Sequence, residues 1–132
     1  GFRRVTDIGG DLTIADNSSL MDLMGLDQLR TVGGSVAIER NDGLASLNGL
    51  SSLTRVGRGI AVSDHESLRD IARLKSLQSV TGDIAFISNP VLPACSVDIF
   101  EYDLKKAQVS GNVVQRFNDD RAGCGRSSVP ER

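Results

Sequence analysis

His65 is the only histidine of the chain, and it stands between two carboxylates, Asp64 and Glu66. An imidazole beside carboxylates has the groups needed for general acid–base catalysis or for metal binding. Neighbouring side chains on a turn do not point at a common centre, however, and a metal ion needs about three or four converging ligands. We therefore predict a structural role for His65, no catalytic residue, no metal site and no cofactor.

Asp16, Arg40 and Asp64 form a second charged set, spaced 24 residues apart. In a chain of stacked coils, such residues lie in one column about one strand spacing apart, so opposite charges pair. Paired carboxylates or Asp/Lys/Arg clusters on an outer face also serve parallel β-helix enzymes that cleave polysaccharides. We favour a solvated ion ladder, because the sequence contains no nucleophilic triad, phosphate-binding loop, dinucleotide motif or zinc spacing.

A period of 24 residues organises the whole chain. It is visible in four apolar columns: Ile8, Val32, Val56 and Val80; Leu12, Val36, Ile60 and Ile84; Ile14, Ile38, Val62 and Phe86; and Leu20, Leu44, Leu68 and Leu92. A short fixed period is typical of a solenoid, in which each coil buries its apolar side against its neighbours. We predict repeats that start at residues 8, 32, 56 and 80, after a truncated coil at 1–7.

Each coil begins with a glycine-containing turn and continues as a short strand of alternating apolar and small residues. The predicted strands cover residues 11–15, 35–39, 59–63 and 83–87. Because equivalent strands of successive coils run in the same direction, they form a parallel sheet. The rest of each coil carries leucines three residues apart, which suits an extended path with short 3₁₀ segments better than an α-helix.

The turn after each strand carries a polar residue in register: Asn17, Asn41, His65 and Asn89. Asparagine at such a corner stacks as a ladder and forms hydrogen bonds with the turn backbone from inside. We expect a ring nitrogen of His65 to make the same inward hydrogen bond.

The outward strand positions form a flat stripe of small residues that suits contact with another flat surface. Its members Thr13, Ala37, Glu39, Ala61, Ser63 and Ala85 are candidate binding residues. The alternatives are a neutral stripe, or a stripe covered by another region of a longer protein. Arg69 and Arg73 form a second candidate, either a basic patch for an acidic partner or glycan, or a solvated rim.

Two prolines, Pro90 and Pro93, end the winding of the fourth coil. Ser96 is the expected cap of a helix that runs to about Gln108, with Asp98 in its first turn and an apolar face that covers the last coil. That face consists of Val97, Phe100 and Leu104. Residues 109–112 are a candidate edge strand. The predicted organisation is solenoid coils at 1–94, a helical cap at 95–124 and a disordered tail at 125–132.

The repeat reads G-x-L-x-I-x-x-N-x-x-L-x-x-L-x-G-L-x-x-L-x-x-V-G-G over residues 10–34 and again over 34–57. This pattern resembles the receptor L domain and its bacterial relatives. The resemblance implies a mainly β fold, a leucine-rich right-handed parallel β-solenoid, on a secreted or cell-surface protein. The end of the fourth coil, a helix and a second cysteine resemble the closing cap of those proteins. Arg58, His65 and Arg73 depart from the pattern in the third coil.

Cys95 and Cys124, the only cysteines, lie on either side of the predicted helix. In a secreted chain, a disulfide that closes the end of the solenoid is the favoured interpretation. Two free buried thiols in a cytosolic protein are the alternative.

The formal net charge of −2 indicates no basic field for nucleic acid or an anionic membrane surface. No apolar run is long enough for a membrane span. Because the chain opens in the middle of a coil, we expect further coils upstream of Gly1. The leading hypothesis is a non-enzymatic extracellular or cell-surface recognition or adhesion module for a protein or glycan. A structural spacer or wall component is the alternative, and a polysaccharide-acting enzyme is less favoured.

Overall fold

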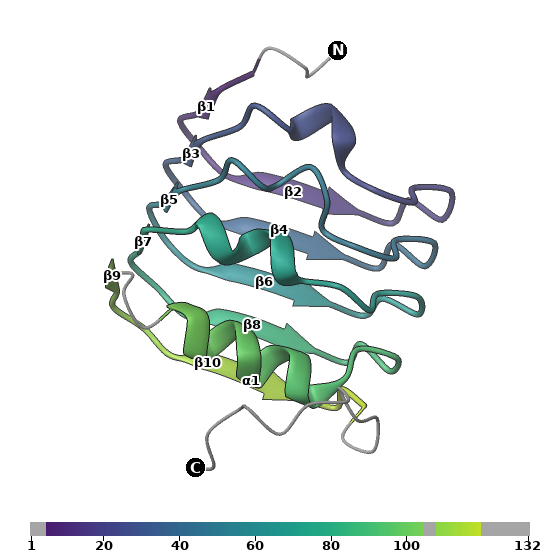
Figure 1. Cartoon of the computed structure of the whole chain (residues 1–132). Coiled ribbons are helices and arrows are strands. Elements are labelled where there is room, and N and C mark those ends of the chain that lie inside the picture. The colour runs from purple at the N-terminus through teal and green to yellow at the C-terminus, as the bar shows by residue number, and fades with distance from the viewer. Residues whose placement is uncertain (1–4, 105–107, 120–132) are drawn as a thin grey trace.

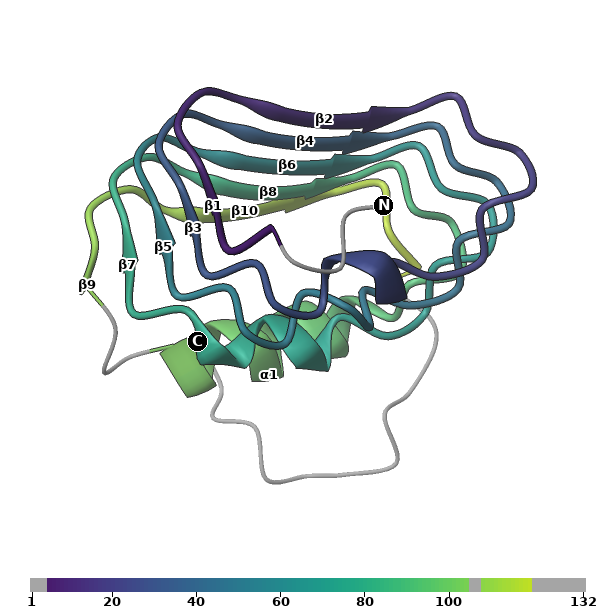
Figure 2. The ribbon, with the colours of Figure 1, turned by 90° about the horizontal axis from the view of Figure 1, so that it is seen from above.

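The chain winds as a right-handed parallel β-solenoid in a computed structural model that describes residues 5–104 and 108–119. Seen from the N-terminal end, the chain runs clockwise as it moves away from the viewer (Figure 2). Each turn has three sides, which are a sheet of long strands, a sheet of short strands and a side of helices and loops (Figure 1). The predicted fold class is therefore confirmed.

The long-stranded sheet holds one strand from each turn, and all of its neighbours are parallel. Its strands are β2 (Leu12–Ala15), β4 (Val36–Glu39), β6 (Ile60–Ser63), β8 (Ile84–Ile87) and β10 (Val113–Arg116). The first four pair with an offset of 24 residues, as in Leu12 opposite Val36 and Val36 opposite Ile60. They agree with the predicted strands to within one residue at the N-terminal end, because alternation of buried and half-buried positions specifies the register.

A second parallel sheet was not predicted from the sequence. It consists of two-residue strands before the glycine turns: β1 (Asp7–Ile8), β3 (Thr31–Val32), β5 (Arg55–Val56), β7 (Ser79–Val80) and β9 (Gln108–Val109). Two residues are too few for an alternating pattern to be recognised. Glycine follows these strands because the coils approach closely there: a Cβ atom added to Gly57 would overlap the backbone carbonyl of Gly33.

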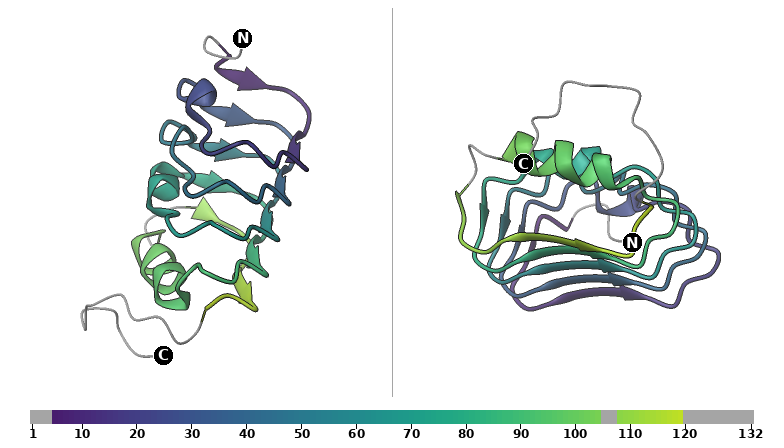
Figure 3. Two further views of the ribbon diagram at one scale, coloured as in Figure 1. Left: turned by 90° about the vertical axis from the view of Figure 1, so that its right-hand side faces the viewer. Right: turned by 90° about the horizontal axis from the view of Figure 1, so that it is seen from below.

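The third side of the solenoid carries the leucines spaced by three and short 3₁₀ helices, as predicted. Helix η1 covers Met24–Leu26 and helix η2 covers Ala72–Ser76. Both lie opposite the long-stranded sheet (Figure 3). The equivalent segment of the second coil instead turns through Gly49, whose positive φ of 106° is readily adopted only by glycine.

The core is a narrow column of aliphatic side chains between the three sides. The most deeply buried of them lie on the apolar columns and among the leucines spaced by three, and include Leu29, Ile38, Leu44, Leu47, Leu53, Val62, Leu68, Leu74, Ile84 and Leu92. Arg58, His65 and Arg73 do not disturb the third coil, because β6 keeps its register with both β4 and β8.

The last turn is longer than the others, since Ile84 lies opposite Val113, 29 residues further on. The extra length accommodates α1 (Ala94–Asp103), the single α-helix among the described residues. Both sheets continue beyond this helix as β9 and β10, so α1 lies within a closing turn of the solenoid (Figure 1). The chain does return to both sheets, but the edge strand predicted at 109–112 is misplaced: only Val109 of these residues lies in a strand, and residues 110–112 connect β9 to β10.

The boundaries predicted for this helix are wrong at both ends. It begins at Ala94 rather than after Ser96, and it ends at Asp103 rather than near Gln108, which belongs to β9. Pro93 occupies the N-cap position with no side-chain cap, Ser96 lies inside the helix, and no acidic residue lies in the first turn. The φ of Pro93, −62°, is compatible with the extended backbone of an N-cap, and its carbonyl accepts the backbone N–H of Ser96 at 2.9 Å, which places Ser96 in the first turn. Asp98 instead accepts a hydrogen bond from Gln115 at 3.0 Å.

The apolar face predicted for the helix is confirmed. Val97, Phe100 and Leu104 are buried, and the ring of Phe100 packs edge-on against Phe86 with centroids 5.4 Å apart. Such an aromatic pair adds about 0.5–1.5 kcal/mol to simple burial. The helix thereby closes the core of the last turn.

Several predictions fall outside the described residues. Residues 1–4 of the truncated coil, Cys124 and the tail at 125–132 belong to this group, so the disulfide and the domain limits stay predictions. Within the described ranges, no helix combines the length and the apolar character required to cross a bilayer.

Candidate functional site: the outer sheet face and the asparagine ladder

The outer face of the long-stranded sheet presents two columns of side chains in strict register. One column contains Thr13, Ala37, Ala61, Ala85 and Val114. The next contains Ala15, Glu39, Ser63, Ile87 and Arg116. All ten residues are half-buried or exposed, whereas the residues between them in β4, β6 and β8 are buried. The structure thus brings together six of the eight predicted binding residues.

This face is suited to contact rather than to chemistry. Seven of its ten side chains are alanine, serine, threonine or valine, and Glu39 and Arg116 are its two charged members. The strands beneath it pair on both sides within the sheet, except at its ends, so their backbone groups are satisfied. A flat, weakly charged surface of this kind packs against another flat surface without burying unpaired charge.

Arg69 and Arg73 are not brought to this face. Arg69 is exposed and lies beside the isolated bridge between Ser46 and Asp70, on the path from β6 to η2. Arg73 belongs to η2, opposite the sheet, and its side chain lies outside what the structure describes. The second predicted surface is therefore separate from the first.

A corner follows each long strand, and its first residue has a left-handed backbone. These residues are Asp16, Arg40, Asp64, Ser88 and Phe117, with φ between 54° and 63°. A left-handed residue is unusual outside glycine and reverses the direction of the chain sharply. The corner turns the following side chain into the interior, and this is why the next residue in each turn is a ladder residue.

The charged column on these corners contains one close ion pair. Arg40 Nε lies 2.7 Å from Asp16 Oδ1, and Arg40 Nη2 lies 3.1 Å from Asp16 Oδ2. This hydrogen bond lowers the pKa of Asp16 and raises that of Arg40. Asp64 acts on Arg40 only through space, so the predicted ladder of three charges is a bidentate pair with one distant member.

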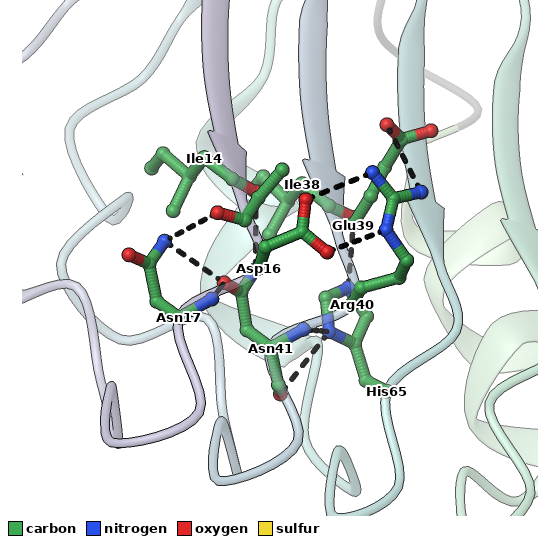
Figure 4. Close-up of polar contacts among 9 residues, drawn as sticks. Ile14, Asp16, Asn17, Ile38, Glu39, Arg40, Asn41 and His65 are labelled. Carbon is green, nitrogen blue, oxygen red and sulfur yellow. Dashed lines mark hydrogen bonds and ion pairs between the residues drawn. The ribbon is translucent and has the colours of Figure 1, made fainter.

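The asparagine ladder is present and connects each turn to the one before it. Figure 4 shows its members Asn17, Asn41 and His65. Asn41 Oδ1 accepts the backbone N–H of Asn17 at 3.0 Å, and Asn41 Nδ2 donates to the carbonyl of Ile14 at 3.0 Å. Asn89 repeats the pattern two turns later, with the backbone N–H of His65 at 3.2 Å and the carbonyl of Val62 at 3.1 Å. The side chains of the inner members are fully buried, so these hydrogen bonds satisfy polar groups that water cannot reach.

His65 occupies a rung of this ladder, as predicted. Its Nδ1 accepts the backbone N–H of Asn41 at 3.2 Å, and its Nε2 lies 2.7 Å from the carbonyl oxygen of Ile38. The two ring nitrogens thus replace the oxygen and nitrogen of an asparagine amide. Asp64 and Glu66 are exposed on the same turn, and among the described residues no three His, Cys, Asp or Glu side chains gather as metal ligands do.

Sequence reasoning missed the fifth rung, Asn118. Its Oδ1 accepts the N–H of Asn89 at 3.1 Å, and its Nδ2 donates to the carbonyl of Phe86 at 2.8 Å. The offset of 29 residues hides it from a search at a period of 24. A strand followed by one corner residue and an asparagine, as at residues 113–118, is the signal that would have found it.

These features define the class of the molecule as a parallel β-solenoid with a polar ladder inside each corner. Comparison of the chain with models of known families, with curated proteins and with solved structures gave no match.

Proposed function

We propose that this chain is a non-enzymatic recognition or adhesion module of the receptor L-domain type, which binds a protein or a glycan at a cell surface or outside the cell. The observation that carries the proposal is the outer face of the long-stranded sheet, where Ala37, Ala61 and Ala85 lie in one register column. Small side chains lose little conformational entropy when a partner covers them. The leucine-rich repeat and its resemblance to L domains support the extracellular assignment.

A structural spacer is the second candidate. The observation in its favour is the uniform ladder, because Asn41 and Asn89 link successive turns in the same way and the sheets keep one register over three turns. Such repetition makes a stiff rod that keeps other domains apart. A spacer needs no contact residues on the sheet face, and this separates the two candidates.

Binding to a glycan array and to a panel of secreted proteins tests the proposal, with the variant Ala61→Arg beside the wild type. Arginine at position 61 projects from the middle of the face and adds bulk and charge there. The matched control is Ala72→Arg, the same substitution at an exposed position of η2, opposite the sheet.

We expect a ligand that binds the wild type and the Ala72→Arg variant equally, and the Ala61→Arg variant at least ~10-fold more weakly, a loss of about 1.4 kcal/mol. Equal binding by all three proteins would show that the outer face of the long-stranded sheet is not the binding surface. The absence of any ligand would favour the spacer.

A further inference from the structure

The rung formed by His65 differs from the others because an imidazole takes up a proton in the mildly acidic range and an amide does not. The carbonyl of Ile38 can only accept a hydrogen bond, so the Nε2 atom beside it carries the ring hydrogen. The backbone N–H of Asn41 can only donate, so Nδ1 must present a lone pair. The geometry therefore requires the neutral imidazole with hydrogen on Nε2.

We propose that His65 makes the contact between the second and third turns of the solenoid an acid-sensitive joint. Protonation of the His65 ring separates these two turns. A proton on Nδ1 faces the N–H of Asn41, so two donors oppose each other in a fully buried position. The carbonyl oxygen of Asn41 lies 3.4 Å from Nδ1, which is long for a hydrogen bond from the new proton. The N–H of Asn41 is then left buried without an acceptor, and an unsatisfied group of this kind is costly.

The charged groups on the adjoining turns favour proton uptake once the joint opens. Asp64 and Glu66 flank His65 on its own turn, and Arg40 and Asp42 flank Asn41 on the turn before, all four exposed. The charge of Arg40 is balanced by its ion pair with Asp16. The net charge around His65 is therefore set by the carboxylates of Asp42, Asp64 and Glu66 and is negative. Residues 88 and 90, which flank the next rung, are serine and proline and carry no charge.

Among the described rungs of the ladder, the others are asparagines and carry no titratable group. Asn41 and Asn89 carry the ladder above and below with amides, so acid does not change their hydrogen bonds. The chain's matched control is therefore His65→Asn, which restores the residue found at the equivalent position of the other turns.

Thermal unfolding of the wild type and of His65→Asn at pH 7.5 and pH 5.0 tests the proposal. We expect the melting temperature of the wild type to fall by at least ~3 °C more than that of the variant between the two pH values. Histidine in an unfolded chain takes up its proton within this range. In the folded protein a proton on Nδ1 costs the hydrogen bond from Asn41, so we expect stability to be lost as the pH decreases. An equal fall in both proteins would overturn the proposal.

Amide hydrogen exchange of the wild type gives a second readout that does not depend on the folding of a variant. We expect the protection of the Asn41 amide, relative to that of the Asn89 amide, to fall at least ~10-fold from pH 7.5 to pH 5.0, because only the former bonds to the imidazole. Nitrogen-15 shifts of the single imidazole should report hydrogen on Nε2 at pH 7.5. A constant protection ratio, or hydrogen on Nδ1, would contradict the mechanism.

Discussion

Asn118 accepts the backbone N–H of Asn89 across a turn that is five residues longer than the turns before it. The extra residues are absorbed by α1 on the opposite side of the coil, and the corner keeps its geometry: Ser88 and Phe117 have φ angles of 59° and 60°. The corner and its ladder are thus the constant element of this solenoid, and the helical side is the variable one.

Removal of an inner rung should destabilise the fold strongly. In Asn89→Ala, the N–H of His65 and the carbonyl of Val62 lose their partners in the buried interior. We expect the free energy of unfolding to fall by about 2–4 kcal/mol, as measured by urea denaturation. Asn17→Ala is the control, because the Asn17 side chain is exposed. Its Nδ2 donates to the carbonyl of Ala15 and to Asn41 Oδ1, and Asn41 Oδ1 keeps the backbone N–H of residue 17 in the variant. It should cost less than about 1 kcal/mol, and a loss in Asn89→Ala no larger than this would show that the buried rung adds little stability.

A cavity in the aliphatic column should be costly as well. Leu47 has no exposed surface, so Leu47→Ala should lower the free energy of unfolding by about 2–5 kcal/mol through lost transfer energy and an unfilled cavity. Met21, which is 70% exposed, provides the control: Met21→Ala should change stability by less than about 0.5 kcal/mol. A small effect at Leu47 would mean that the leucine column does not form the core.

The predicted disulfide between Cys95 and Cys124 is tested by reduction. It would close a loop of about 29 residues, which the chain-entropy estimate values at about 3–4 kcal/mol. Under reducing conditions we expect the melting temperature to fall by about 10 °C or more. The double variant Cys95→Ala/Cys124→Ala should melt at the lower temperature with or without reductant. An unchanged midpoint for the reduced wild type would favour free thiols.

The ion pair on the outer corner should be visible in a carboxyl titration. The hydrogen bond from Arg40 lowers the pKa of Asp16, so the stability from this pair is present above the ordinary aspartate pKa of about 3.9 and is lost as the pH falls through the lower folded value. In Arg40→Gln we expect the pKa of Asp16 to rise toward its ordinary value, as followed by carbon-13 NMR.

Asp7 is the internal reference for this titration. Its pKa is lowered mainly by hydrogen bonds from Thr31 and Thr6, which Arg40→Gln leaves in place, so it should not change. A rise at both carboxyls would indicate a general loss of structure, and no rise at Asp16 would show that the pair does not form in solution.

The period of 24 residues was sufficient to predict the long strands, because Leu12, Val36, Ile60 and Ile84 can share one interior only if equivalent strands stack in parallel. The role of His65 was predictable for the same reason: its place in the register, rather than its chemistry, decides what it contacts. The candidate binding columns followed from alternation alone, but whether they bind anything stays a prediction.

Where the repeat changes length, the sequence pattern no longer predicted the structure. The start of α1 at Ala94, the position of β9 and the fifth rung at Asn118 depend on contacts between residues at offsets other than 24. The sequence by itself determined which residues point inward, since that is a matter of local alternation and spacing. Only the tertiary structure decided how the last turn closes. The requirement there is that β10 pairs with β8 and that the corners after these two strands stack. The period of 24 residues does not specify how many residues on the helical side satisfy this requirement.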